Sequence, residues 1–216
     1  MKKFDYMVFC DFDGTATAWE TSEALLELLI GSDRFNAKIK QLLADHIGTS
    51  QGIKELYQMI SSDRYPELLD YVKTIKLRDG FVDFLFELKK RNIPIVLISG
   101  AVTEMVYAVL EQCQDLFLDI YCCTLDKSSS VFHVSSDFDD GVDLLRKELV
   151  MQRYDYKTSI FIGDSYTDMN AAQKADIVFA RDRLETFLDN RNISYHPFDS
   201  FHDIIETFQQ EGFANI

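Results

Sequence analysis

Four strand-length apolar runs, separated by stretches of helical periodicity, constrain the fold of this chain more than any other feature of its sequence. Each run is almost continuously apolar, whereas a strand with one face in water alternates apolar and polar residues. Continuous runs are typical of strands buried on both faces of a parallel sheet. The runs cover residues 6–10, 93–98, 159–162 and 177–180, and a weaker fifth run covers residues 119–123.

Helical patterns fill the gaps between these runs. They cover residues 80–90, 102–112, 142–153, 167–174 and 183–189. Strands that alternate with helices predict an α/β fold with a doubly wound, mostly parallel sheet. Ligands bind such sheets beyond the carboxyl ends of the strands, so the residues that follow each run are the first candidates for a functional site.

One region interrupts the alternation directly after the first run. Four amphipathic helical segments follow each other there, at residues 23–30, 37–46, 53–60 and 66–75. We therefore predict a small all-helical cap subdomain at residues 17–77, inserted into an α/β core formed by residues 1–16 and 78–216. Because the insertion leaves the sheet at its ligand-binding edge, the cap could close over a substrate. The polar segment 127–140 is expected to form a loop or a small hairpin.

The charge balance of the chain restricts its partners. The formal net charge is −14, and 47% of the residues are hydrophobic. The hydrophobic content suffices for a packed core, while the negative charge opposes binding to nucleic acid or to an anionic membrane. An anionic substrate would need a local positive centre, which a bound metal ion would provide. We expect a small-molecule partner, no nucleic acid and no membrane, with the chain acting as a monomer or a homodimer.

The cysteines and the first residues predict a cytoplasmic protein. The four cysteines are Cys10, Cys113, Cys122 and Cys123, and no C-x-x-C pattern occurs. Adjacent residues of a strand point to opposite faces, so Cys122 and Cys123 cannot easily chelate a metal together. The lysines at the N-terminus are not followed by the long apolar stretch of a signal peptide. We expect core cysteines in a reducing compartment.

The first run ends in two aspartates that lie two residues apart. Side chains alternate across a strand, so Asp11 and Asp13 can face the same side, and Gly14 lets the chain turn away. Paired carboxylates suit a hard divalent cation, and an aspartate beside such a cation can act as a nucleophile. A calcium loop would need glycine and glutamate where this chain has Ala16 and Ser22. An ordinary acidic turn is the remaining alternative.

Two other runs also end in polar residues. The second run leads into Ser99 and Gly100 just before a predicted helix, where a phosphate group would be favoured, although a simple turn would look the same. The third run leads into Asp164, with Asp168 about one helical turn further on. Asp168 could merely cap a helix, whereas Asp164 has no such structural explanation. Acidic and hydroxyl groups are thus expected to meet at one edge of the sheet.

The combination D-x-D-G-T, then S-G, then G-D-x-x-x-D, at successive strand ends, resembles the haloacid-dehalogenase-like phosphatase superfamily. The resemblance covers the whole chain, including a helical cap after the first motif. The stretch 161–201, with its G-D-S, F-A-R-D and H-P-F segments, is similar to the methionine-salvage branch, which dephosphorylates 2-hydroxy-3-keto-5-methylthiopentenyl 1-phosphate. Glu20, nine residues after Asp11, stands where phosphoserine-phosphatase-like members keep an acid that contacts the substrate.

The resemblance implies a mechanism with two catalytic aspartates. Asp11 would attack phosphorus and form an aspartyl-phosphate, while Asp13 would protonate the leaving oxygen and then activate water. Mg²⁺ would be held by Asp11, by the main-chain carbonyl of Asp13 and by Asp164. It would offset the repulsion between the nucleophile and the phosphate.

The resemblance also assigns the remaining site residues. Ser99 and the N–H of Gly100 would bind the phosphoryl oxygens, Glu20 would contact the substrate, and Asp168 would orient its loop. Passage of the phosphoryl group to a second hydroxyl instead of water cannot be distinguished at this level.

One departure concerns the lysine that the superfamily places near the start of the helix before the G-D-x-x-x-D strand. Here that helix is expected to begin at residues 139–143, which contain no lysine, so that Arg146 and Lys147 would face solvent. The phosphate still needs a cation, and Lys147 is the first candidate and Lys127 the second. The alternative is a catalytically impaired member that binds a metabolite or a protein partner.

The substrate prediction depends on the junction of cap and core. Trp19 and Glu20 are expected there, facing the leaving group, where an acid favours a hydroxyl or ammonium group and repels a second anion. In phosphoserine phosphatases an arginine binds the carboxylate of the substrate. By resemblance, the corresponding position in this chain lies near Leu56, which has no charge. We therefore predict a small polar phosphomonoester other than phosphoserine, with the methionine-salvage phosphate as the first named candidate.

Overall fold

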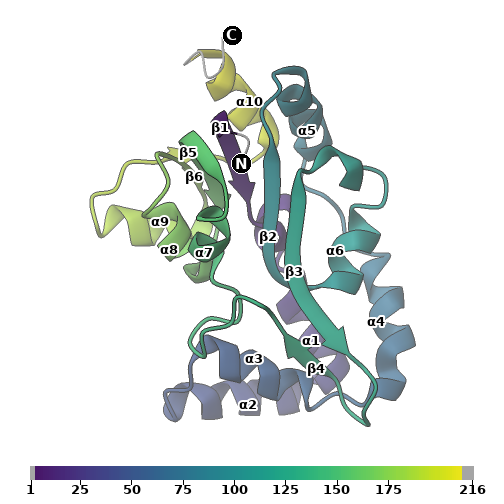
Figure 1. The fold of residues 1–216 in the computed structure, drawn as a ribbon. Helices are drawn as coiled ribbons and strands as arrows, with labels where there is room; N and C mark the ends of the chain where they lie inside the picture. The colour runs from purple at the N-terminus through teal and green to yellow at the C-terminus, as the bar shows by residue number, and fades with distance from the viewer. Residues whose placement is uncertain (1–2, 211–216) are drawn as a thin grey trace.

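A seven-stranded sheet forms the centre of the molecule in the computed structural model, which describes residues 3–210 (Figure 1). The strand order is β4-β3-β2-β1-β5-β6-β7, and all neighbours are parallel except the antiparallel pair β3 and β4. The strands are β1 (Lys3–Cys10), β2 (Ile95–Val102), β3 (Asp119–Asp126), β4 (His133–Ser135), β5 (Asp155–Gly163), β6 (Ile177–Ala180) and β7 (His196–Pro197). The predicted mostly parallel α/β sheet is confirmed.

Helices cover both faces of the sheet because its central strands are apolar on both sides. In β1, Met7 and Phe9 belong to one buried cluster, while the intervening Val8 and Cys10 belong to the other. The second cluster is completed by α5 (Phe81–Lys90) and α10 (Phe201–Gln210). The first face is covered by α7 (Lys147–Met151), α8 (Met169–Ala172) and α9 (Asp182–Asp189), and α6 (Thr103–Val109) follows β2.

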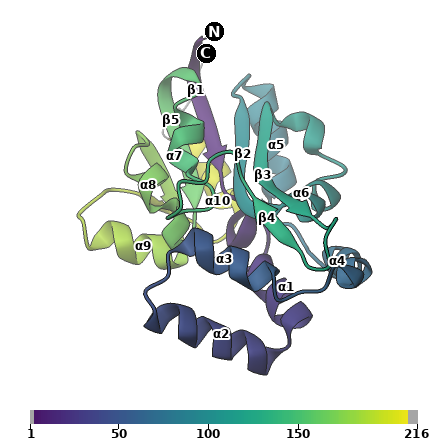
Figure 2. The same cartoon turned by 60° about the horizontal axis from the view of Figure 1, so that its bottom comes forward.

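The segment between β1 and α5 forms four α-helices that lie together beyond the carboxyl ends of the strands (Figure 2). They are α1 (Thr21–Ile30), α2 (Ser32–Ala44), α3 (Thr49–Tyr57) and α4 (Tyr65–Val72). At the neck of this helical group, Thr17 and Leu77 form an isolated antiparallel bridge. These two residues coincide with the limits at which we place the cap, residues 17–77.

The cap is bound to the segment that connects β3 to α7. Next to the β3–β4 hairpin, the N–H groups of Ser62 and Phe132 donate to the carbonyls of Ser130 and Ile60, each at 3.0 Å. At the other end of the connecting segment, Asp139 accepts a hydrogen bond from Ser50 Oγ at 2.8 Å and pairs with Lys54 of α3. The cap therefore has two lateral attachments to the core besides its neck.

Three local elements differ from the sequence prediction. The helix predicted at residues 142–153 begins only at Lys147, because the Asp140 carboxylate accepts the N–H groups of Val142 and Asp143, each at 2.9 Å, and forms a turn instead. Gly141 has φ +86°, which also excludes a right-handed helix there. The short strand β7 and the helix α10 were not predicted.

We predict that the Asp139→Ala substitution lowers the free energy of unfolding by about 1–3 kcal/mol, because Ser50 and Lys54 lose their shared acceptor. Urea unfolding followed by circular dichroism measures this change. Asp137→Ala removes an exposed carboxylate from the same segment and is the matched control. Equal stability of the two variants would show that Asp139 does not fasten the cap.

Candidate active site

Three adjacent central strands deliver the predicted site residues to one place. β1 lies between β2 and β5, and Cys10 is level with Leu97 on one side and with Ile162 on the other. The next residues along these strands include Asp11, Ser99 and Asp164, all of which are buried. Asp11 and Ser99 line a cavity of about 550 Å³. Asp164 contributes an oxygen to the same carboxylate cluster as Asp11.

The lysine expected to face solvent is buried in the centre of the site. Lys147 Nζ lies 2.5 Å from Asp11 Oδ1 and 2.5 Å from Asp168 Oδ1. Burial alone would lower the pKa of Lys147, but the two carboxylates raise it overall, so the ammonium stays charged. Lys147 was our first candidate for the missing cation, whereas Lys127 pairs with Glu104 at 3.6 Å outside the cavity.

The solvent-facing expectation failed because the helix was placed too early. Since α7 begins at Lys147, this residue occupies the first turn, next to the carboxyl ends of the strands, and is not a turn and a half into the helix. Arg146 is drawn away from the site by Asp140 and Glu148.

Asp168 holds both the loop and the lysine. One of its oxygens accepts the N–H groups of Asp164, at 3.0 Å, and Ser165, at 2.9 Å, and the other accepts Lys147. Its carboxylate thus caps a helical turn and connects the strand end to α7. The same hydrogen bonds therefore cap the helical turn and orient the loop, which are the two roles that the sequence suggests for Asp168.

Asp164 is held close to the backbone of the first motif. Thr15 Oγ1 donates to Asp164 Oδ1 at 2.5 Å. Gly14 has φ +77°, and a Cβ built on it would lie 2.6 Å from Asp164 Oδ2, so no larger residue fits there. Burial and the neighbouring Asp168 raise the pKa of Asp164 to about 8.

The carboxylates of Asp11, Asp164 and Asp168 can hold a divalent cation. Their oxygens lie within 4.8 Å of one another. Both oxygens of Asp168 accept hydrogen bonds from the protein. Asp11 and Asp164 are therefore the better candidates to offer lone pairs to a cation. Burial raises the pKa of Asp11 well above its usual range even though Lys147 opposes the change. A hard cation would relieve this excess of buried negative charge.

Asp13 faces the cap. Its carboxylate accepts hydrogen bonds from Thr21 Oγ1 at 2.6 Å, from Ser22 N at 2.8 Å and from Thr21 N. These donors form the first turn of α1, whose free N–H groups and positive dipole end favour a carboxylate. The second aspartate of the motif is therefore fixed by the cap as well as by the core.

Arg78 is a site residue that the sequence analysis missed. It comes from the neck of the cap, and its guanidinium donates to the carbonyls of Gly14 at 2.5 Å, Thr15 at 2.8 Å and Thr17 at 3.0 Å. These bonds hold the turn that follows Asp11. Nothing in the local sequence indicates this role, because Arg78 is more than sixty residues away from the turn it binds.

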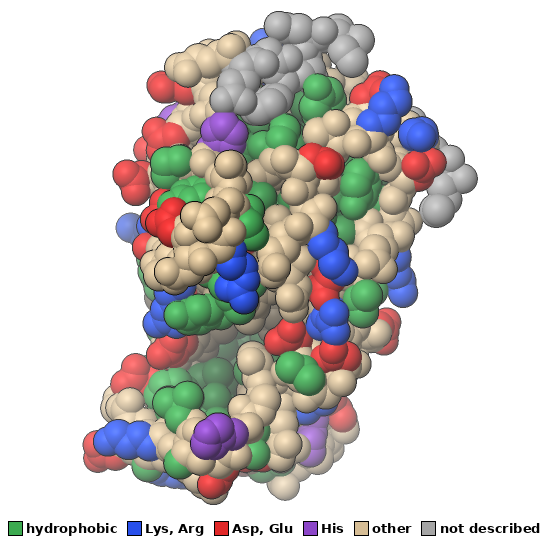
Figure 3. Space-filling model, turned by 90° about the vertical axis from the view of Figure 1, so that its left-hand side faces the viewer, with side chains coloured by type: hydrophobic (Ala, Val, Ile, Leu, Met, Phe, Trp, Pro, Cys, Tyr) green, Lys and Arg blue, Asp and Glu red, His purple; other side chains and the backbone are tan. Residues whose placement is uncertain are grey.

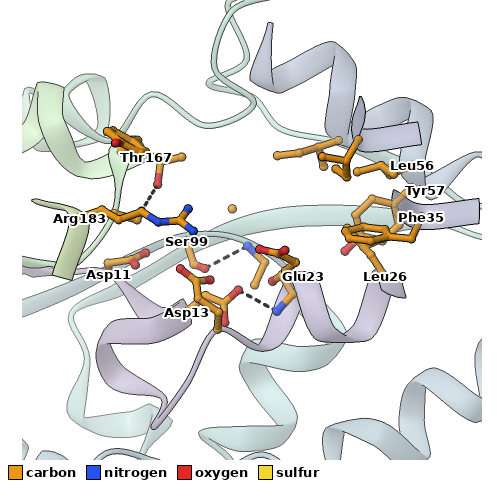
Figure 4. A pocket seen from close by; sticks show the side chains of 18 of the residues that line it. Asp11, Asp13, Glu23, Leu26, Phe35, Leu56, Tyr57, Ser99, Thr167 and Arg183 are labelled. Carbon is orange, nitrogen blue, oxygen red and sulfur yellow. Dashed lines mark hydrogen bonds between the residues drawn. The ribbon is translucent and has the colours of Figure 1, made fainter. Parts of the chain in front are cut away.

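The cap side of the cavity is largely apolar (Figure 4). Leu56 lines the wall at the position where a phosphoserine-binding arginine was expected. The apolar side chains of this wall are Leu26, Phe35, Ile39, Leu43, Ile53, Leu56 and Tyr57. Figure 3 shows the hollow between cap and core, with hydrophobic side chains inside it.

The rim of the cavity is polar. Glu20 lines it, and burial together with the carboxylates of Asp13 and Asp11 raises the pKa of Glu20 to about 8. Trp19, at 38% exposure, precedes it but does not line the cavity. Gly100 also lines the cavity, and a Cβ built on it would meet no atom within 4 Å. The face of Gly100 is therefore open to a ligand.

Within residues 3–210, no helix is both long and apolar enough to cross a membrane.

Comparison with known proteins agrees with this geometry. The family model of the haloacid dehalogenase-like hydrolases matches residues 8–173. A protein of Microcystis aeruginosa named 2-hydroxy-3-keto-5-methylthiopentenyl-1-phosphate phosphatase is 37% identical over 202 residues, which cover 93% of this chain and 96% of the relative. A protein of the same name from Bacillus cereus is 33% identical over 207 residues, which cover 91% of this chain and 93% of the relative.

Solved structures show the same fold at low sequence identity. A substrate-bound phosphoserine phosphatase complex aligns with a TM-score of 0.71 at 15% identity, covering 96% of this chain and 99% of that chain. A phospho-aspartyl intermediate analogue of phosphoserine phosphatase aligns with a TM-score of 0.70 at 15% identity, covering 95% and 99%. The chain belongs to the haloacid dehalogenase-like hydrolase family, and it is a phosphatase of that family.

Proposed function

We propose that the protein is a Mg²⁺-dependent phosphomonoester hydrolase whose nucleophile is Asp11. The observation that carries this proposal is the position of Asp11, buried between Lys147 and the other carboxylates and lining a substrate-sized cavity. A carboxylate with a free oxygen beside a charged ammonium can attack a phosphate that would otherwise repel it.

The two aspartates divide the chemistry. Lys147 holds Asp11 Oδ1, so Oδ2 is the oxygen that forms the bond to phosphorus as the ester bond breaks. Asp13 gives its proton to the leaving oxygen, and the product alcohol departs. Asp13 then takes a proton from water, which attacks the aspartyl-phosphate and releases inorganic phosphate. The hydrogen bonds from Thr21 and Ser22 keep Asp13 oriented through both steps.

Ser99 and Gly100 are proposed to hold the phosphoryl oxygens. The Ser99 Oγ accepts the N–H of Ala101 at 3.0 Å, which leaves its own hydrogen free to donate. Gly100 is open to the cavity, so its backbone can approach an oxygen closely. We propose that Asp11, the main-chain carbonyl of Asp13 and Asp164 hold Mg²⁺. When bound, the ion supplies positive charge against the phosphate.

The substrate is proposed to be a small phosphorylated metabolite with an apolar tail. The apolar wall of the cap suits such a tail, and Leu56 offers no charge to a carboxylate. This modifies the sequence prediction of a polar substrate in one respect, because only the part near the phosphate meets polar groups. 2-hydroxy-3-keto-5-methylthiopentenyl 1-phosphate is the first named candidate, as in the names of the relatives.

The proposal also includes a catalytically competent site and a cytoplasmic location. The buried Lys147 disfavours the alternative of an impaired, purely binding protein. All four cysteines are free thiols, in keeping with the proposed cytoplasmic location. We propose activity as a monomer or a homodimer.

Asp11→Asn should lower kcat by at least about 1,000-fold, because a neutral amide is a poor nucleophile and a poor ligand. Hydrolysis of p-nitrophenyl phosphate in Mg²⁺ measures the effect, and circular dichroism checks the fold. Asp13→Asn should also be severely impaired for natural substrates, whose leaving oxygen needs a proton. Undiminished turnover by purified Asp11→Asn would disprove the assigned nucleophile.

Metal binding should stabilise the protein more at pH 8 than at pH 5.5. The pKa of Asp164 is about 8 in the folded protein against 3.8 as its ordinary value. Its contribution to the stability of the metal-free protein is therefore complete below about pH 3.8 and is lost as pH rises toward 8. Mg²⁺ binds the ionised form and should restore this loss. Thermal unfolding with Mg²⁺ or with EDTA at both pH values tests the prediction, and Asp164→Asn should reduce the difference.

The apolar wall should select the tail of the substrate. Leu43 lines the cavity but is 73% exposed, so Leu43→Ser should not disturb folding. We predict that it lowers kcat/KM for the methylthiopentenyl substrate about 5- to 10-fold through lost apolar contact, with little effect on phosphoserine. Leu28→Ser removes another exposed leucine outside the cavity and is the control. A wild-type preference for phosphoserine would refute the substrate proposal.

A further inference from the structure

Two polar side chains that line the active-site cavity have no hydrogen-bond or ion-pair partner among the described residues. The first is Arg183 of α9, which forms no hydrogen bond or ion pair within residues 3–210. The second is Ser22 of α1, whose Oγ is buried and has no hydrogen-bond partner. The Ser22 hydroxyl is unusual, because buried hydroxyls are normally satisfied. Arg183 is exposed, so its guanidinium is available to a ligand.

Arg183 is placed to meet a bound ligand. Figure 4 shows its side chain extending from α9 toward the middle of the cavity, while α1, with Glu23, borders the cavity elsewhere. Lys147 is the other basic side chain among the described residues that line this cavity, and it is occupied by Asp11 and Asp168. The guanidinium of Arg183 therefore carries positive charge that no described protein group uses.

Arg183 is more exposed than the proposed phosphoryl position. That position lies beside Asp11, which is buried, whereas Arg183 is exposed and also borders an adjoining cavity lined by Glu20 and Asp164. Ser22 is linked to the leaving group, because its N–H donates to Asp13, the residue proposed to protonate the leaving oxygen. Both residues thus line the cavity into which the part of the substrate beyond the ester oxygen would extend.

We propose that Arg183 and Ser22 form a subsite that recognises an oxygen acceptor on the carbon next to the phosphate ester carbon. This inference rests on the proposed function and adds a requirement on the substrate. Arginine only donates hydrogen bonds, so it selects a carbonyl or enolate oxygen, and the serine hydroxyl can donate to the same group. A simple alkyl phosphate would leave both groups unpaired and would be disfavoured.

The test compares dihydroxyacetone phosphate, which has a carbonyl at that carbon, with propyl phosphate, which has none. The wild type should prefer the carbonyl compound. Arg183→Met should lower its kcat/KM about 10- to 100-fold, mainly through KM, and Ser22→Ala about 3- to 10-fold, while the loss on propyl phosphate should be much smaller for Arg183→Met. Arg191→Met removes an exposed arginine just after the same helix, one that stacks on Phe187, and is the charge control.

Thermal unfolding separates recognition from a structural role. Neither variant removes a hydrogen bond of the protein, so the melting temperatures should be unchanged, and that of Ser22→Ala could rise. Equal losses for both phosphates would place Arg183 on the phosphate, and no loss for either would remove it from the site. A preference of the wild type for phosphoserine that Arg183→Met abolishes would make Arg183 a carboxylate clamp. Each of these results overturns the proposal.

Failure of the proposed function would give a different result. The wild type would then hydrolyse none of these compounds in Mg²⁺. Calorimetric binding of the two phosphates to the wild type and to Arg183→Met would still decide the subsite. Tighter binding of dihydroxyacetone phosphate than of propyl phosphate, lost in Arg183→Met, supports it, and equal binding of both overturns it.

Discussion

The ammonium group of Lys147, buried between Asp11 and Asp168, is the interaction on which the rest of the site depends. Among residues 3–210 it is the only cation within 4.0 Å of this carboxylate cluster, which would otherwise bring three carboxylates together in a buried space. Removing one partner of a buried ion pair leaves the other charge unpaired at a cost of about 3–5 kcal/mol. The position of Lys147 in turn requires that α7 begin at this residue and that β1 and β5 be neighbours.

In the proposed mechanism, the cap contributes to the chemistry as well as to the enclosure of the cavity. Its first helix holds Asp13 through Thr21 and Ser22, and its neck supplies Arg78 to the turn after Asp11. The attachment of α3 to Asp139 ties the cap to the loop that leads into α7. The position of the cap is therefore coupled, through short stretches of chain, to both the proposed acid and the cation. This coupling explains how one insertion can provide selectivity and also complete the catalytic site.

Sequence reasoning located the groups that lie at strand ends and failed where side chains redirect the backbone. Asp11, Ser99 and Asp164 follow continuous apolar runs. The strand pattern and the short motifs at the strand ends therefore both predicted that these residues come together. Lys147 was misplaced because the aspartates before it bond to nearby N–H groups and delay the helix, and these bonds are not visible in apolar periodicity. Arg78 was missed because its contacts depend on tertiary structure.

The same limit applies to the elements at the edge of the sheet. β7 has two residues and no apolar run, so it is stabilised by its neighbour and not by its own sequence. The helix α10 does carry apolar residues at helical spacing, and its Phe201 packs against Phe81 and Phe84 of α5. The helical spacing of α10 was therefore visible in the sequence. Its packing against α5 was not, because α5 and α10 are separated by more than a hundred residues.

The charge distribution sets the final constraint on the substrate. With a net charge of −14, the protein repels anions at long range, and salt reduces this repulsion beyond about 10 Å. A phosphate can bind only where positive charge is concentrated, which here means Lys147 and the proposed metal site. A second anionic group on the substrate would extend from that place toward Glu23, which lines the same cavity. Glu23 would repel a second anion, so this charge distribution supports the proposed substrate class, with a single phosphate, a neutral oxygen beside it and an apolar remainder.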